Sequence, residues 1–135
     1  SPEDKKASEQ KEKDLSELTE KMQSVLEGKV KSVRVSLRLT DSPACLVADE
    51  ADLGGNLERI LAAMGQSAPD AKPIMEINPD HPLIRQLDPE HARLGDWTQV
   101  LFDQAALSEG APLPEPAAYV QRVNDLLTRA ALAGN

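Results

Sequence analysis

The feature that most constrains the fold of this chain is a change in hydrophobic period at Gly28. Before this glycine, apolar residues recur every three or four positions, which predicts a helix that ends at Gly28. After it, apolar and polar residues alternate from Val33 to Leu39, which predicts a half-buried strand. The helical stripe consists of Leu15, Leu18, Met22, Val25 and Leu26. A helix followed directly by a strand predicts the α+β class.

Two further apolar runs predict the rest of the sheet. Residues 44–47 follow turn chemistry at Asp41, Ser42 and Pro43, and they predict a second strand that pairs with the first as a hairpin. Residues 74–77 lie between prolines and predict a third strand. We therefore expect a sheet of about three strands, antiparallel or mixed.

Helix start and stop signals place three helices after this sheet. Asn78 followed by Pro79 predicts the start of a short helix that runs to about Leu87. Two longer helices are predicted over residues 91–108 and 116–132, each with a glycine just beyond its end. A proline-rich connection joins these two helices into a hairpin.

Charge and hydropathy limit the classes of partner. The net charge of −8 disfavours nucleic acid, because affinity for phosphates depends on Lys and Arg. The sequence contains no run of about 18 apolar residues, so we expect no membrane partner. Cys45 is the only cysteine, which permits no internal disulfide and predicts the cytoplasm.

Residues 1–14 offer only Ala7 as an apolar side chain, and we expect a charged, frayed lead-in before one domain over residues 15–135.

The residues suggest no catalytic, cofactor or metal site. There is no HExxH, no Gly-rich phosphate loop and no GxSxG elbow. His81 and His91 lie in proline-rich turns and favour surface or capping roles. Cys45 sits in an apolar run, where burial would raise its pKa and leave it inert. The alternative of a free-standing small acidic protein with a carrier or enzymatic role depends on Ser42, which Pro43 follows directly.

Two sets of apolar stripes remain as candidate binding surfaces. The first, over residues 49–64, predicts an amphipathic helix that either covers the sheet or presents an apolar face. The second, on the last two helices, is broad enough to favour a partner surface. The first stripe consists of Leu53, Leu57, Ile60, Leu61 and Met64. The second consists of Trp97, Val100, Leu101 and Ala105, followed by Tyr119, Val120, Val123, Leu126, Leu127 and Ala130.

Three strings carry a resemblance to a known family. They are TDSPACLV from Thr40, ADLGGNLERILAAMGQ from Ala51 and KPIMEINPDHPLI from Lys72. From about Val30 to Leu132 the chain resembles the C-terminal domain of the 90-kDa heat-shock chaperones, in the bacterial form called high-temperature protein G.

The resemblance implies a dimerisation domain of a cytoplasmic stress-response chaperone. Its last two helices would form a four-helix bundle with those of a second copy, through Trp97, Val100, Leu101, Ala105, Val120, Val123, Leu126, Leu127 and Ala130. A projecting helix would contact partly unfolded client proteins through Leu53, Leu57, Ile60, Leu61 and Met64. ATP and magnesium would bind in an N-terminal domain outside this chain, so this fragment itself is no enzyme. The chain ends Leu132, Ala133, Gly134, Asn135 rather than Met-Glu-Glu-Val-Asp, so no tetratricopeptide co-chaperone should dock there.

Overall fold

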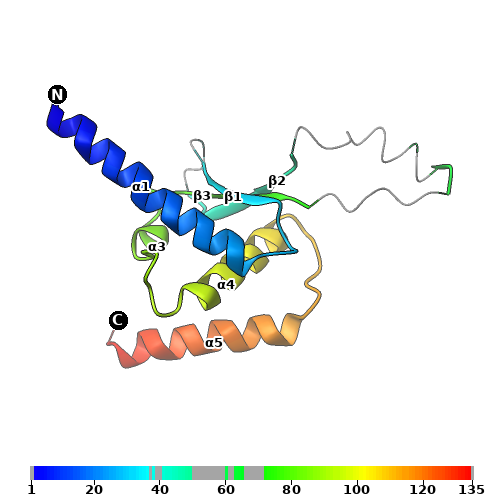
Figure 1. The fold of residues 1–135 in the computed structure, drawn as a ribbon. Helices are drawn as coiled ribbons and strands as arrows, with labels where there is room; N and C mark the ends of the chain where they lie inside the picture. The colour runs from blue at the N-terminus through cyan, green and yellow to red at the C-terminus, as the bar shows by residue number, and fades with distance from the viewer. Residues whose placement is uncertain are drawn as a thin grey trace.

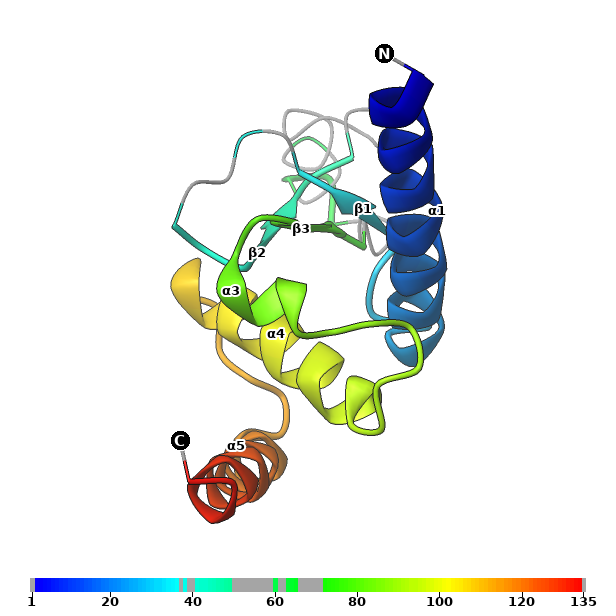
Figure 2. The ribbon, with the colours of Figure 1, turned by 90° about the vertical axis from the view of Figure 1, so that its left-hand side faces the viewer.

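The computed structural model describes residues 2–36, 38, 41–49, 60, 63–65 and 72–134. Within these ranges a small sheet is packed against helices (Figure 1), which confirms the predicted α+β class. The helix α4 lies between the sheet and the helix α5 (Figure 2). The elements in chain order are α1 (Pro2–Val25), β1 (Ser32–Val35), β2 (Ala44–Val47), β3 (Ile74–Ile77), α3 (Pro82–Arg85), α4 (Leu94–Ser108) and α5 (Pro116–Leu132).

The sheet is mixed, with β3 between the other two strands. The strand β1 runs parallel to β3, with Val33 opposite Met75, and β2 runs antiparallel to it, with Leu46 opposite Met75. The predicted hairpin between the first two strands is therefore wrong. All four residues of β3 are buried, whereas β1 and β2 are only partly buried. In the central position both edges of β3 are paired, which fits a strand whose four residues are all buried.

The first strand is also shorter than the alternating pattern predicts. It ends at Val35, although the backbone N–H of Ser36 still donates to Ile77 O at 2.8 Å. The hydroxyl Oγ of Ser36 then accepts from the backbone N–H of Arg38 at 3.2 Å. This side-chain bond turns the backbone away from β3, because it replaces a ladder partner with a local one. Leu37 and Leu39 lie outside the described residues.

The helix α1 is longer than predicted at its N-terminal end. It begins at Pro2 rather than at Leu15 and so includes the charged lead-in, whose fraying in solution stays a prediction. Its predicted stripe is confirmed, since Leu18 and Met22 are 2% and 0% exposed. After the helix, Gly28 adopts a φ of 85°, a conformation that costs glycine little, and this confirms the predicted stop.

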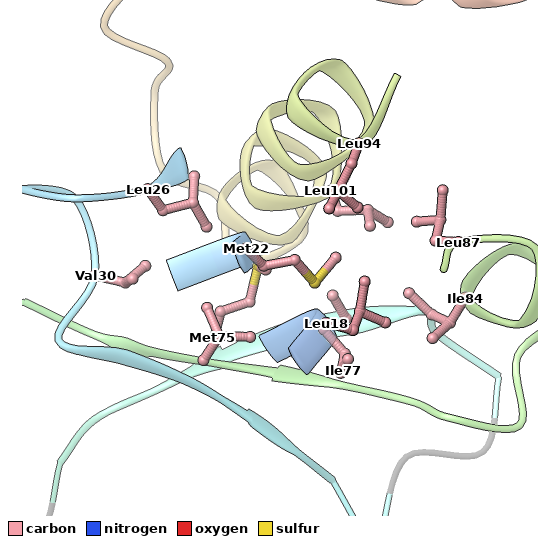
Figure 3. Packing of buried hydrophobic residues seen from close by; sticks show 12 residues of the cluster. Leu18, Met22, Leu26, Val30, Met75, Ile77, Ile84, Leu87, Leu94 and Leu101 are labelled. Atoms are coloured by element: carbon pink, nitrogen blue, oxygen red, sulfur yellow. The ribbon is translucent and has the colours of Figure 1, made fainter. Parts of the chain in front are cut away.

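The hydrophobic core lies between the sheet, α1 and α4. Figure 3 shows Met22 of α1 above Met75 of β3, with Leu101 of α4 facing the same space. The helix α3 closes one side through Ile84. The buried cluster comprises Leu18, Met22, Leu26, Val30, Val33, Ala44, Met75, Ile77, Ile84, Leu87, Leu94 and Leu101.

The short helix α3 begins later than predicted. It starts at Pro82, and His81 is its N-cap, whose Nδ1 accepts from the backbone N–H of Leu83 at 3.1 Å. Asn78, the predicted cap, accepts instead from the N–H of Asp80 at 3.1 Å and donates its amide to Ser42 O at 3.2 Å. Asn78 thus lies in the turn that follows β3, where it is hydrogen-bonded to the residues before β2, and the helix begins after that turn.

The two long helices agree with their predicted ranges apart from one boundary. The helix α4 begins at Leu94 rather than at residue 91, because His91 Nδ1 accepts from the N–H of Arg93 at 3.0 Å in the preceding turn. The helix α5 spans the predicted residues, with Pro116 at its first position. Gly110, which follows α4, has a φ of 82°. Both helices therefore end near the predicted glycines.

Candidate functional site

The helix α5 presents an apolar edge to solvent. Val120 and Leu127, seven positions apart and so on one face, are 52% and 61% exposed. The helix buries Leu126 against its own chain, while Ala130 and Ala131 are exposed. Exposed apolar side chains grouped on one face indicate an interaction surface. We define the α5 edge as Val120, Val123, Leu127, Ala130 and Ala131.

The predicted interface residues fall into groups of different exposure. Leu101 belongs to the core cluster, and Val100, Ala105 and Leu126 are also buried within their own chain. Their burial is explained by packing inside one copy, and any role between two copies stays a prediction. Trp97 and Val123 are half-buried, whereas Val120, Leu127 and Ala130 are exposed.

One ion pair links α5 to the start of α4, and a second lies within α5. The guanidinium of Arg93 pairs with the carboxylate of Asp125, and the Nε of Arg129 lies 3.2 Å from Asp125 Oδ2. The hydrogen bond from Arg129, with the charge of Arg93, holds the pKa of Asp125 below its usual range. Such exposed pairs contribute little stability, but they orient α5 with its apolar edge turned away from the core.

A buried carboxyl lies on α4, which contacts α5. Asp103 is 8% exposed, and burial raises its pKa. The charges of Lys29 and Arg122 oppose this rise, and the charge of Glu115 adds to it. Because Arg122 belongs to α5, its attraction to Asp103 favours the observed docking of the two helices. The sequence analysis missed Asp103, although a charged residue inside an apolar stripe is a recognisable signal.

The predicted client-contact helix is only partly described. Leu53, Leu57 and Leu61 lie outside the described residues. Ile60 and Met64 are 54% and 66% exposed, and the backbone N–H of Met64 donates to Ile60 O at 3.1 Å. This helical bond places both side chains on one face. These two residues offer an apolar surface to solvent, and whether the stripe covers the sheet or contacts clients stays a prediction.

The sheet carries a buried acidic side chain that the sequence analysis did not identify. Glu76 on β3 accepts from Arg34 Nε at 2.8 Å and from Arg38 at 3.3 Å. Burial would raise the pKa of Glu76, but the two arginines outweigh it and hold the pKa below its usual value. The signal was a glutamate within an apolar strand and arginines on the polar face of another. The cluster ties β3 to β1 and to the segment that follows β1.

The remaining candidate residues take structural roles. The prediction for both histidines is a surface or capping role: His81 caps α3, and His91 accepts the backbone N–H of Arg93 in the turn before α4. Cys45 is half-buried, and burial followed by the charge of Glu76 raises its pKa as predicted. Ser42 is exposed in the turn before β2 and does not start a helix, so it lacks the setting that a carrier serine needs.

Neither a metal centre nor a membrane span emerges from the described ranges. No three His, Cys, Asp or Glu side chains among these residues are arranged to hold a metal ion. No helix in this part of the chain is long and apolar enough to cross a membrane.

Comparison with known proteins places these features in a family. The family described as Hsp90 protein matches residues 1–133. A chaperone protein HtpG of Nitrosomonas europaea is 53% identical over 132 residues, which are 98% of this chain and 21% of that relative. The corresponding protein of Burkholderia ambifaria is 54% identical over 93% of this chain and 20% of its own length. That of Aromatoleum aromaticum is 55% identical over 92% and 19%, respectively.

This chain spans about a fifth of the length of these curated relatives. The match nevertheless covers nearly all of the chain itself, including the sheet, the core and the α5 edge. The chain therefore belongs to the heat-shock protein 90 family of chaperones.

Proposed function

We propose that this chain is the C-terminal homodimerisation and client-contact domain of an ATP-dependent chaperone. The observation that carries the proposal is the α5 edge, where Val120 and Leu127 are more than half exposed on a helix that contacts α4. In a two-fold dimer the same edge would be buried on both copies, because such an interface is isologous. Two hairpins paired in this way form the four-helix bundle that the family resemblance implies.

The size of the edge limits its contribution to association. Burying a large apolar side chain fully is worth about 1.5 to 3 kcal/mol. Val120 and Leu127 are 52% and 61% exposed, so both residues from two copies give about 3 to 7 kcal/mol gross. Association itself costs about 4 to 15 kcal/mol. A stable dimer must therefore also bury neighbouring half-exposed residues such as Tyr119, Val123 and Trp97.

Light scattering over a dilution series tests this proposal. We expect a doubled mass for the wild type and a monomer mass for Leu127→Asp, because the carboxylate would be buried without a partner. Gln121→Asp is the matched control, since Gln121 is also exposed on α5 and the change adds the same charge. A wild-type monomer at every concentration would refute the dimerisation, as would equal masses for Leu127→Asp and the wild type.

We propose further that Ile60 and Met64 contact partly unfolded clients, together with Leu53, Leu57 and Leu61. The support is the exposure of the first two side chains on one helical face. We expect the double variant Ile60→Asp and Met64→Asp to capture less of a partly unfolded protein than the wild type does. Ala48→Asp is the control at another exposed position. Unchanged capture by the double variant would contradict the role.

The rest of the proposed function follows from the family. ATP and magnesium would bind in a different domain, and dimerisation here would hold two such domains near each other in the cytoplasm. No nucleic acid, membrane or tetratricopeptide partner is proposed for this chain. A covalently attached prosthetic group on Ser42, or turnover by the isolated chain, would instead favour the carrier or enzymatic alternative.

A further inference from the structure

A groove of about 610 Å³ lies between α1 and the segment around α3. Its apolar lining includes Leu15 and Leu18 of α1 and Ile84 of α3. Leu18 and Ile84 are each 2% exposed and form the floor, whereas Leu15 is half-buried on the wall. In Figure 1 the N-terminal part of α1 extends past α3, while Asp14, Leu15 and Leu18 from the second half of the helix line the groove.

A contact links α1 to the chain after α3 beside the groove. Lys21 of α1 donates its ammonium to Pro89 O at 2.9 Å and pairs with Glu90 at 2.7 Å. Both bonds are exposed and add little stability. Pro79 and Pro89 also line the groove, and proline limits the backbone freedom of its walls. The two prolines therefore lower the entropic cost of ordering these walls around an occupant.

The charges around this groove are mostly acidic. Asp14, Asp80 and Asp88 line it together with one cation, Arg85. Asp88 accepts the backbone N–H of Glu90 at 2.8 Å, and Asp14 accepts an amide from Gln10 at 3.0 Å. Neither of these bonds comes from a cation. An occupant that places positive charge beside apolar side chains would meet complementary partners.

We propose that this groove binds a short peptide segment of a partner protein in which apolar residues stand beside Lys or Arg. The apolar side chains would lie between Leu15 and Ile84, and the basic side chains would reach the three aspartates. A volume of about 610 Å³ fits a few side chains, within the range of preformed ligand sites. Among the described residues, neither the α5 edge nor Ile60 and Met64 line the groove, so the proposal does not depend on them.

The probe is a fluorescein-labelled peptide in which leucine and lysine alternate. Its binding to the full chain is measured by fluorescence anisotropy. The counterpart that alternates leucine with glutamate has the same apolar content and opposite charge. We expect the basic peptide to bind at least about ten times more tightly, and its affinity to fall as salt screens the aspartates.

Two single variants with a matched control assign the binding to this surface. Asp80 is exposed, and Asp80→Lys should weaken binding of the basic peptide about three- to tenfold. Asp41→Lys makes the same charge change at an exposed position that does not line the groove, and it should bind like the wild type. Leu15→Ala should weaken both peptides by a similar factor because it removes part of the apolar wall.

The affinities and solution masses of these variants show whether the peptide binds in this groove. Equal affinities for Asp80→Lys and Asp41→Lys would overturn the proposal, because net charge alone would then attract the peptide. A change in solution mass caused by Asp80→Lys would overturn it in favour of contact with a second copy. Loss of dimerisation in Leu127→Asp with unchanged peptide affinity would separate the groove from the proposed dimer.

Discussion

Leu101→Ala should destabilise the folded chain by about 3 to 5 kcal/mol even when the chain is monomeric. Leu101 is 1% exposed and belongs to the cluster that contains Met22 and Met75. The substitution removes three carbon atoms, and at about 0.8 kcal/mol each this gives about 2.4 kcal/mol of lost transfer free energy. The remaining cavity adds to that loss, because a packed core relaxes only in part. The sequence interpretation of Leu101 as a contact between copies predicts no such loss in a monomer.

Urea unfolding of a monomeric background separates these two roles. Leu101→Ala is introduced into the Leu127→Asp variant. The free energy of unfolding, extrapolated to water, is then compared between this double variant and Leu127→Asp alone. Val120→Ala in the same background is the control, because Val120 is 52% exposed and its truncation should change stability by less than about 0.5 kcal/mol. A loss of stability below about 1 kcal/mol for Leu101→Ala would refute the assignment of Leu101 to the core, because truncation of a packed core leucine costs more than that.

Three further predictions concern buried or constrained positions. Arg34 and Arg38 hold the pKa of Glu76 in the folded state below its usual value. The folded protein is therefore stabilised at pH values above the unfolded-state pKa of about 4.3, and this stabilisation is lost as the pH falls through the lower folded-state pKa. The urea midpoint should therefore drop more on acidification for the wild type than for Glu76→Gln, and parallel pH curves would contradict this. The buried hydroxyl of Thr98 has no hydrogen-bond partner, so Thr98→Val should be neutral or stabilising by up to about 1 kcal/mol, and a clear loss in thermal melts would argue against it. Gly28 has a φ of 85°, so Gly28→Ala should cost about 1 kcal/mol by urea unfolding, and an unchanged midpoint would show that the turn relaxes.

Much of the fold could be predicted where the signal was local. The strands at residues 44–47 and 74–77 and the helix over residues 116–132 match the structure because each depends on its own periodicity and on nearby prolines. Prediction failed where a residue had a distant partner. Asn78 resembles a helix cap in sequence, but its side chain bonds to Ser42 O across the sheet, and the helix starts after His81.

The candidate site shows the same division. The sequence identified the apolar face of α5, but periodicity could not tell Leu126, which is 6% exposed, from Leu127, which is 61% exposed. Adjacent positions on a helix differ by about a quarter turn, and the neighbouring helix decides which of them is covered. The groove between α1 and α3 had no sequence signal, because its walls are far apart in the chain.

The α+β class, most of the elements, the capping role of His81 and the family of the chain could all be recognised in the sequence. The strand order β1–β3–β2 could not, since Val33 pairs with Met75 across some forty residues of chain. Tertiary packing also selected which apolar residues form the core and which stay exposed. The physical reason is that local propensity depends on neighbours in sequence, whereas pairing and burial minimise the exposed apolar area of the whole chain.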